Sequence, residues 1–295
     1  MRSIVVLPTY NERENIAAML DALVSLGAAL QIVVVDDNSP DGTAAIAEDR
    51  SRRHGRIHTV VRRDERGLGT AYACGFRHAL DLGADAIVTM DCDFSHDPAD
   101  VLRLLDRLAR CDVAMGSRYV PGGGTRGWPI RRKLFSRAAN AFARACLELE
   151  PQDCTSGFRA YRGPLLECLI GQSLQSRGYS IQVELLARAV RQFGAKAVEV
   201  PILFREREHG TSKIGWREAF AGCRAIMAVR RQLAHAAPQP VPAVSVGAGA
   251  PGGEDTGGRP EACGRDAGGA AGVPCRADLA RAARAGTATG GGYPR

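Results

Sequence analysis

The feature that most constrains the fold of this chain is a regular alternation of β-branched runs and helical patterns over residues 1–120. Runs rich in Val and Ile, bounded by turn residues, predict strands at 3–7, 31–36, 58–61, 86–90 and 113–117. Apolar residues recur at helical spacing in the segments 12–26, 41–53, 69–82 and 98–110. Strands separated by helices of this length form right-handed βαβ units. The sequence therefore predicts an α/β fold with a mostly parallel, Rossmann-like sheet flanked by helices.

The second half of the chain has a different character. Segments 131–149 and 216–235 predict helices with apolar residues interleaved by basic ones, and 163–171 and 182–192 predict two more helices. Residues 153–162 are expected to be irregular or extended. Residues 197–204 predict a last strand, interrupted by Pro201.

Composition shifts after residue 236. Residues 237–295 hold 14 of the 34 glycines and 7 of the 15 prolines, and Tyr293 is their one aromatic residue. A segment so poor in large apolar side chains cannot bury enough surface to offset the entropy of ordering it. We therefore expect one globular domain over residues 1–236 and a disordered Gly/Pro/Ala-rich tail over 237–295. A domain of that length buries roughly 70% of its unfolded surface and needs no disulfide or metal for stability.

Several classes of protein are excluded at this stage. The sequence contains no run of uncharged apolar residues long enough for a transmembrane helix, and the apolar run at its start is too short for a signal peptide. Its nine cysteines are scattered without a CxxC pair, which indicates a reducing cytosol and argues against a zinc site. The net charge of +7 comes mainly from arginine and suits nucleic acid, an anionic membrane or phosphorylated substrates.

Polar residues follow several predicted strands, at the edge where parallel sheets bind ligands. The strongest cluster is Asp91-Cys92-Asp93, directly after the strand at 86–90. Two carboxylates at this spacing supply the hard oxygen ligands that Mg²⁺ or Mn²⁺ prefers, and such ions commonly bridge a diphosphate. The alternative is a simple polar exit from the strand. Acidic residues at the other strand ends favour the metal, and Cys92 itself is expected to be inert.

The second strand also ends in acidic residues, Asp36 and Asp37. A carboxylate there accepts hydrogen bonds from a ribose or a base edge. Helix capping and turn chemistry explain the neighbouring Asp41 and Gly42, but not two adjacent acids after a buried strand. The stretch from Gly67 begins like a dinucleotide fingerprint but lacks its third glycine, so we interpret it as a tight turn that opens a helix.

Cations are spread through the second half. They are Arg118, Arg131, Arg132, Lys133, Arg159, Arg162 and those of the loop 205–213. One guanidinium group can donate two parallel hydrogen bonds to the oxygens of a phosphate, although most surface arginines contact only solvent. Arg207 and Lys213 flank a Gly-Thr-Ser stretch and are expected to close over an anion. His96 is interpreted as a residue near a helix start, in preference to a base or metal ligand.

Seven stretches resemble a known family. LPTYNEREN at 7–15, VDDNSPDGT at 35–43 and MDCDFSHDP at 90–98 are similar to the nucleotide-sugar half of inverting GT-A glycosyltransferases. GSRY at 116–119, SRAAN at 136–140, SGFRAYR at 156–162 and REHGTSK at 207–213 resemble dolichol-phosphate (polyprenol-phosphate) mannosyltransferases of family 2. The resemblance covers about residues 2–233. The first three motifs occur in many sugar transferases, whereas the last four in this order are more specific.

The resemblance implies a GT-A fold and transfer of mannose from GDP-mannose to a polyprenyl (dolichyl) phosphate with inversion, giving polyprenyl phosphomannose. It implies that the guanosine part is held by Pro8, Tyr10, Glu12, Val35 and Asp37. It implies that Asp91 and Asp93 hold the divalent metal and the diphosphate, beside the Cys92 backbone. Phosphate contacts of donor or acceptor are implied for Arg118, Arg207 and Lys213. The chain departs from the family pattern in having Cys92 between the two acids and a Gly/Pro tail where many relatives have transmembrane helices.

The chemistry is consistent with the residues present. A lipid phosphate is already anionic at neutral pH and attacks without a strong base, so positioning and charge neutralisation suffice. The two basic helices are expected either to lie on an anionic membrane surface or to pack with solvated arginines. We expect a peripheral protein on the cytoplasmic face of the membrane. Whether a separate membrane subunit anchors it stays an open question.

Other functions stay open. One alternative is transfer of another nucleotide sugar, UDP-glucose or UDP-N-acetylglucosamine, to a lipid phosphate. A second is a non-catalytic nucleotide-sugar-binding subunit of a membrane complex, although such a subunit does not need Asp91 and Asp93. Nucleic-acid binding is disfavoured because the cations do not alternate with aromatic residues along one element.

Overall fold

A computed structural model gives the structure of residues 1–27, 29–172, 174, 176, 178, 180–206 and 216–242. Arg207, Lys213 and the segment 243–295 lie outside these described residues. The boundary at residue 236 and the disordered tail therefore stay predictions.

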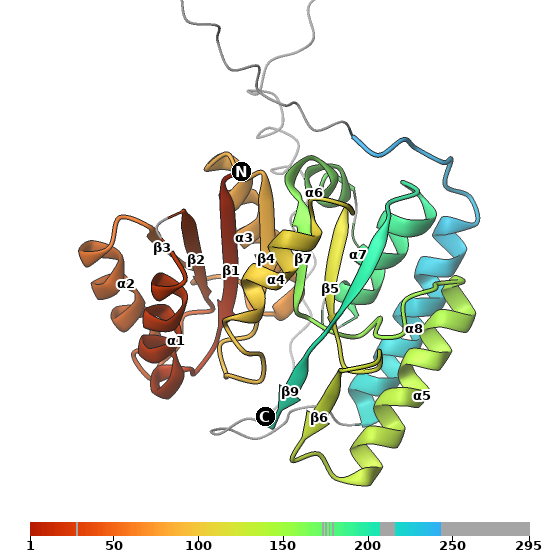
Figure 1. Cartoon of the computed structure of the whole chain (residues 1–295), viewed down its shortest axis with the longest axis horizontal. Helices are drawn as coiled ribbons and strands as arrows, with labels where there is room; N and C mark the ends of the chain where they lie inside the picture. The colour runs from red at the N-terminus through yellow and green to blue at the C-terminus, as the bar shows by residue number, and fades with distance from the viewer. Residues whose placement is uncertain are drawn as a thin grey trace, which may run out of the picture. The chain divides into compact units, whose positions relative to one another are not determined.

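A seven-stranded sheet forms the centre of the fold (Figure 1), in the order β3-β2-β1-β4-β7-β5-β8. Its strands are β1 (Ser3–Thr9), β2 (Leu30–Asp36), β3 (Ile57–Val61), β4 (Ala86–Thr89), β5 (Val113–Ser117), β7 (Arg159–Arg162) and β8 (Ala197–Pro201). The strands pair in parallel except β7, which is antiparallel to both β4 and β5. The predicted mostly parallel sheet is confirmed, and the segment expected to be irregular or extended supplies the one antiparallel strand.

A second, two-stranded sheet pairs β6 (Gly124–Arg126) with β9 (Leu203–Arg205) in parallel. The last predicted strand is thus two strands, β8 and β9, with the break immediately after Pro201. Proline has no backbone N–H to donate to a sheet, so β8 ends there and the chain crosses to the smaller sheet.

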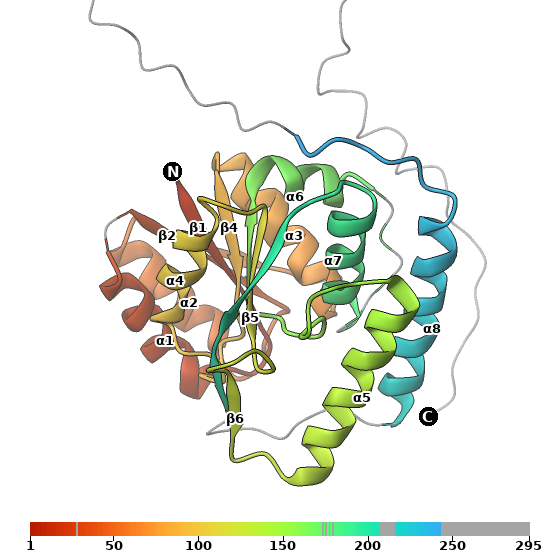
Figure 2. The same cartoon turned by 45° about the vertical axis from the view of Figure 1, so that its right-hand side comes forward.

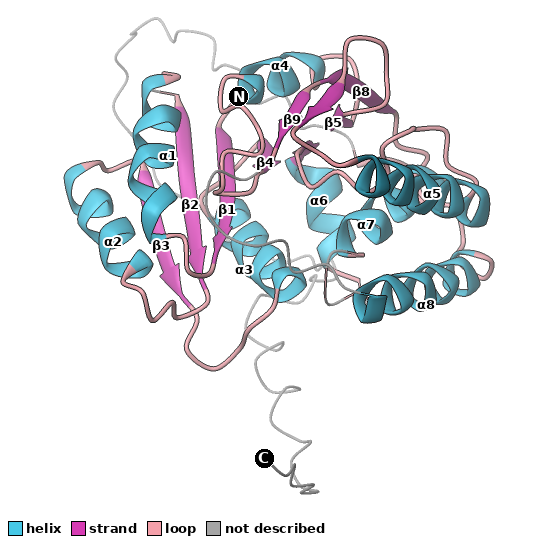
Figure 3. Cartoon of the chain, turned by 90° about the horizontal axis from the view of Figure 1, so that it is seen from below, coloured by secondary structure: helices cyan, strands magenta, loops and turns pink. Residues whose placement is uncertain are grey.

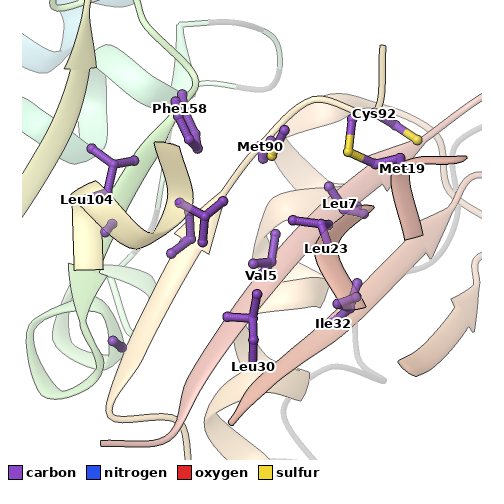
Figure 4. Packing of buried hydrophobic residues seen from close by; sticks show 14 of the residues in the cluster. Val5, Leu7, Met19, Leu23, Leu30, Ile32, Met90, Cys92, Leu104 and Phe158 are labelled. Atoms are coloured by element: carbon purple, nitrogen blue, oxygen red, sulfur yellow. The ribbon is translucent and has the colours of Figure 1, made fainter. Parts of the chain in front are cut away.

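Helices cover both faces of the large sheet. They are α1 (Arg13–Ser25), α2 (Thr43–Arg53), α3 (Leu68–Asp81), α4 (Asp100–Arg107), α5 (Ile130–Leu147), α6 (Gly163–Ile170), α7 (Ile181–Arg191) and α8 (Trp216–Leu233). Alternate residues of β1 point to opposite faces. Val5 and Leu7 pack with α1 and α4 (Figure 4), whereas Ile4 and Val6 pack with α3, α6 and α7.

Beyond the β5–β8 edge, α5 and α8 lie side by side (Figure 3). Ala143 and Leu147 of α5 share a third apolar cluster with Leu186 of α7 and with Ile226 and Val229 of α8. None of the helices in the described part of the chain is both long and apolar enough to span a membrane.

Candidate functional site

The predicted site residues come from loops that share one edge of the sheet. β1 pairs in parallel with both β2 and β4, so the carboxyl ends of all three strands face the same way. The backbone N–H of Asp37, after β2, donates to the carbonyl of Thr9, at the end of β1, over 3.1 Å. The chain therefore brings together the loops that carry Tyr10 and Glu12, Asp37, and Asp91 with Asp93.

The loops after β1 and β2 are bound to each other by side chains. Ser39 Oγ accepts the backbone N–H of Asn11, Thr43 Oγ1 accepts that of Glu12, and Asp41 Oδ2 accepts that of Arg13. The donor–acceptor distance is 3.0 Å in each of these hydrogen bonds. Asp41 also accepts the N–H of Thr43, two residues on, which agrees with the predicted turn chemistry, whereas the N-cap of α2 is Gly42 and has no side-chain cap. Burial disfavours the charged form of Asp41, but hydrogen bonds from Thr43 and Arg13 outweigh it and lower the pKa of this carboxyl.

The adjacent acids after β2 have different surroundings. Asp36 is fully buried and accepts hydrogen bonds from the Thr9 hydroxyl at 2.9 Å and the Ser39 backbone at 2.8 Å. Asp37 pairs with Arg62, whose Nε lies 2.7 Å from Oδ1, and its Oδ2 accepts the Gly67 N–H over 2.8 Å. Asp36 therefore shapes the loop, while Asp37 joins the loops after β2 and β3.

Asp91, Cys92 and Asp93 follow β4 directly. The side chains of Met90 and Cys92 are buried in the core between the sheet and α1 (Figure 4). Burial raises the pKa of the Cys92 thiol well above its usual value, and the charges of Glu12, Asp93 and Asp91 add to this effect. The thiol is therefore held in its neutral form, as expected for an inert residue, and three carboxylates lie in its neighbourhood.

The residues present fit a hard divalent cation. Asp93 is buried with Oδ1 accepting the Ser95 N–H at 3.0 Å, and Asp91 is half-buried. Phe94 has φ of 56°, which turns the chain immediately after the two acids. Among the described residues, no group of three or more His, Cys, Asp or Glu side chains is arranged around a common metal position. A cation at Asp91 and Asp93 would thus take its other ligands from substrate oxygens and water, as Mg²⁺ commonly does.

Arg118, directly after β5, is held from several sides. Its guanidinium donates through Nε and Nη2 to the two carboxylate oxygens of Asp153, at 2.7 and 2.6 Å, and Nη2 also donates to Thr155 Oγ1 at 2.9 Å. Asn140 of α5 donates to the same hydroxyl and accepts the Thr155 N–H. Burial alone would lower the pKa of Arg118, but the hydrogen bonds and charge of Asp153 raise it. Arg118 is therefore charged and fixed in orientation.

Other sequence candidates prove to be structural. Arg159 is fully buried and donates to the carbonyls of Cys154 and Gln182, and Arg162 donates to the carbonyls of Cys111 and Leu108. Both arginines therefore connect backbone segments that are apart in the sequence. This structural role explains the presence of a cation at each position without a bound phosphate. His96 is buried against the ring of Phe158, 4.9 Å between centroids, in the loop that precedes α4. Gly67, with φ of 132°, forms the predicted turn that opens α3.

Residues 4–170 match the model of Glycosyl transferase family 2. The chain belongs to this family. It is 44% identical over 215 residues to polyprenol monophosphomannose synthase of Mycolicibacterium smegmatis (strain ATCC 700084 / mc(2)155), covering 72% of this chain and 81% of that protein. It is 42% identical over 214 residues to undecaprenyl-phosphate mannosyltransferase of Micrococcus luteus, covering 72% of this chain and 88% of the relative.

Among solved structures, the family 2 chain is similar to a mannosyltransferase from Pyrobaculum calidifontis in complex with GDP-Man and Mn²⁺. The TM-score is 0.51 at 19% identity, and the match covers 81% of this chain and 66% of that one. At this identity the likeness concerns the fold alone, and it agrees with the GT-A fold expected from the sequence.

Sequence reasoning missed two partners in this family 2 site, Arg62 and Asp153. Arg62 directly follows β3, at the same carboxyl-terminal end of the sheet as Asp37. A cation immediately after a predicted strand is the sequence pattern that could have identified it. Asp153 lies in the segment predicted to be irregular or extended, and its distance of 35 residues from Arg118 leaves no local pattern. Phosphate contacts of Arg118 and nucleoside contacts of Asp37 stay predictions.

Proposed function

We propose that this chain transfers mannose from GDP-mannose to a polyprenyl phosphate, with inversion at the anomeric carbon, giving polyprenyl phosphomannose. The observation that carries the proposal is the 44% identity to polyprenol monophosphomannose synthase, which extends over 81% of that enzyme. The geometry is compatible with it, because acidic and cationic groups of the kind that a nucleotide diphosphate requires follow β1, β2, β4 and β5.

At the donor end, Pro8, Tyr10, Glu12, Asp37 and the backbone of Val35, whose side chain is buried in the core, would hold the guanosine part. The Tyr10 ring centre lies 5.1 Å from the Arg66 guanidinium carbon, within cation–π distance. Asp91 and Asp93 would hold Mg²⁺ or Mn²⁺, with the Cys92 backbone alongside. A divalent cation bound there supplies positive charge to the departing diphosphate. The Pyrobaculum mannosyltransferase, which has a similar fold, was solved with Mn²⁺ bound.

At the acceptor end, Arg118, Arg207 and Lys213 would neutralise phosphate oxygens. Asp153 and Thr155 accept hydrogen bonds from Nε and Nη2 of Arg118, so Nη1 is the atom that would donate to a phosphate oxygen. The phosphate oxygen is anionic at neutral pH, so it attacks the anomeric carbon without a general base. One in-line displacement breaks the bond to the diphosphate and inverts the configuration of the sugar.

The donor is tested by supplying one polyprenyl phosphate with equal concentrations of GDP-mannose, UDP-glucose or UDP-N-acetylglucosamine and identifying the lipid product by mass spectrometry and NMR. We expect product from GDP-mannose, with the anomeric configuration opposite to that of the donor. A preference for either UDP-sugar, or a product with retained configuration, would overturn this assignment.

A further inference from the structure

The aromatic row, made of His96, Phe204 and Trp128, connects the loop that carries the two acids after β4 with the arginine after β5. His96 lies in the loop after β4, Phe204 in β9, and Trp128 in the connection from β6 to α5, which Figure 2 shows beyond the end of β5. The ring centres of His96 and Phe204 are 5.1 Å apart, as are those of Phe204 and Trp128, and both pairs meet edge to face. This is a geometry that aromatic pairs prefer.

One end of the aromatic row contacts Arg118. The guanidinium carbon of Arg118 lies over the ring of Trp128, 5.3 Å from its centre, and over that of Phe204 at 5.5 Å. Tyr119 adds a third ring at 5.4 Å. Because the Arg118 side chain is only 8% exposed, the electron-rich ring faces replace part of the water that its charge has lost. The rings therefore help to place the guanidinium, together with the carboxylate of Asp153 at its edge.

The other end of the aromatic row is fixed to the loop that carries Asp93. His96 is buried, three residues after Asp93. The backbone is joined at the same place, because the Ser95 carbonyl accepts the N–H of Arg205, the residue after Phe204, over 3.0 Å. Ser95 in turn donates its own N–H to the carboxylate of Asp93. The position of Phe204 is therefore tied to that of Asp93 through the backbone as well as through ring contacts.

Trp128 also joins the start of α5 to the row. The guanidinium carbon of Arg132, in the first turn of α5, lies over the indole at 4.1 Å. Arg132 donates to Glu206 Oε1, two residues after Phe204, over 2.9 Å. Aliphatic side chains would suffice to fill this space, whereas Phe204 and Trp128 each carry a cation on the ring face. The rings therefore have a role toward the cations as well as in packing.

We propose that Phe204 and Trp128 are positioning residues, which set the place of Arg118 relative to Asp91 and Asp93. The inference rests on the proposed function, because that reaction needs a phosphate held at Arg118 in line with a diphosphate held at the two acids. Small errors in such an alignment cost large factors in rate. The two rings act through the guanidinium of Arg118, whose Nη1 would donate to the acceptor phosphate.

The first test is steady-state transfer to polyprenyl phosphate by Phe204→Leu, which removes the ring but keeps an apolar side chain. We expect kcat/KM for the lipid phosphate to fall on the order of tenfold, while KM for the nucleotide sugar stays unchanged. Phe193→Leu is the matched control, since Phe193 is buried and lies just before β8, at the amino ends of the parallel strands. It should lower the unfolding temperature without changing these kinetic constants.

Variants of Trp128 distinguish the aromatic face from the side-chain volume. Trp128→Phe keeps a ring, and the indole N–H that it removes has no hydrogen-bond partner among the described residues, so most activity should remain. Trp128→Leu should lose activity on the order of tenfold. Thermal unfolding checks that every variant folds.

A double variant tests whether the effect passes through Arg118. Single turnovers with enzyme in excess allow slow variants to be followed. In the background of Arg118→Ala, the further change Phe204→Leu should slow transfer by less than about twofold, because residues that act through one group are not additive. The full tenfold loss in that background would overturn the proposal.

Phosphate binding gives a readout that needs no sugar transfer. Trp128 and Trp216 are the two tryptophans of the sequence, so Trp216→Phe leaves Trp128 as the only indole fluorophore. Titration of this variant with farnesyl phosphate, without nucleotide, should change its fluorescence, whereas farnesol should not. Adding Phe204→Leu should raise the Kd for farnesyl phosphate on the order of tenfold.

The outcomes separate this inference from the proposed function. If the unchanged chain forms no lipid product, the proposed function fails, and the fluorescence titration still decides the role of Phe204. Equal Kd values with and without Phe204→Leu would overturn the positioning role. Kinetic constants of Phe204→Leu that match those of Phe193→Leu, or equal losses in Trp128→Phe and Trp128→Leu, would overturn it as well.

Discussion

Arg118 and Asp153 form a buried two-point ion pair, with Nε and Nη2 of the arginine 2.7 and 2.6 Å from the two oxygens of the carboxylate. Asp153 also accepts the backbone N–H of Arg118 over 2.9 Å. The loop that carries the carboxylate is fixed in turn by Glu199 of β8, which accepts the N–H groups of Gln152 and Asp153. The direction in which Arg118 presents its charge is therefore set by a segment that is remote in sequence.

Asp153→Asn should impair both stability and acceptor use. It leaves the buried Arg118 charge without its counter-ion, which costs about 3 kcal/mol of unfolding free energy. Because the Arg118 guanidinium is no longer held in one orientation, KM for the lipid phosphate should rise while KM for the nucleotide sugar stays unchanged. Denaturant unfolding and steady-state kinetics measure the two effects. Asp112→Asn, at the more exposed pair with Arg162, should cost no more than about 1 kcal/mol, and an equal loss in both variants would contradict the positioning role.

Asp93→Asn should abolish metal-dependent transfer while the protein stays folded. The amide keeps an oxygen that can accept the Ser95 N–H but removes the negative charge that a divalent cation needs. Transfer assayed over a range of Mn²⁺ concentrations, together with thermal unfolding, measures the effect. Asp97→Asn, an exposed carboxylate of the same loop, is the control and should retain activity. Wild-type activity in Asp93→Asn would remove the metal role from this residue.

Arg62→Met should destabilise the protein and weaken donor binding. The change keeps most of the side-chain volume but leaves the buried Asp37 carboxylate without its partner, at a cost of about 3 kcal/mol. The loop after β2 then loses the side-chain contact between Asp37 and Arg62 and keeps only the bond from Gly67, so KM for the nucleotide sugar should rise. Arg53→Met, at a solvent-exposed pair with Asp49, should change stability by less than about 1 kcal/mol. An unchanged KM for the nucleotide sugar would contradict a contact between Asp37 and the nucleotide.

His58 should make the protein less stable in mild acid. Burial and the charge of the neighbouring His78, whose ring centre lies 5.9 Å away, lower the pKa of His58 below its usual value. A lowered histidine pKa means that the unfolded chain takes up the proton first, so the stability from this group is complete above about pH 6.5 and declines as pH falls through the folded pKa. His58→Gln should flatten the fall in unfolding free energy between neutral pH and pH 5. An unchanged slope, or the same flattening in His54→Gln, would contradict this.

Much of the N-terminal half could be predicted because short local runs of Val and Ile indicate its strands. The β-branched runs of β1, β2 and β4 lie in buried positions, and the acids after them fall at the strand ends that the parallel register brings together. β7 could not be recognised in the same way. Its four residues begin and end with arginine, and it becomes a strand by pairing with β4 and β5 on its two sides.

The same limit applies to the site. The charge of Arg159 makes it a candidate phosphate ligand, but its guanidinium is buried and donates to the carbonyls of Gln182 and Cys154. Asp37 could be singled out as an acid at a strand end, whereas its partner Arg62 is set by the pairing of β2 with β3. Local patterns located the charged residues, and the tertiary contacts decided which of them hold the fold.

The most direct test of the account is transfer of labelled mannose from GDP-mannose into organic-extractable lipid, with polyprenyl phosphate and Mn²⁺ supplied and with EDTA added to a parallel sample. The account predicts labelled lipid that requires the acceptor phosphate, disappears with EDTA and returns when Mn²⁺ is added back. Absence of labelled lipid under all these conditions, or transfer that persists in EDTA, would contradict it.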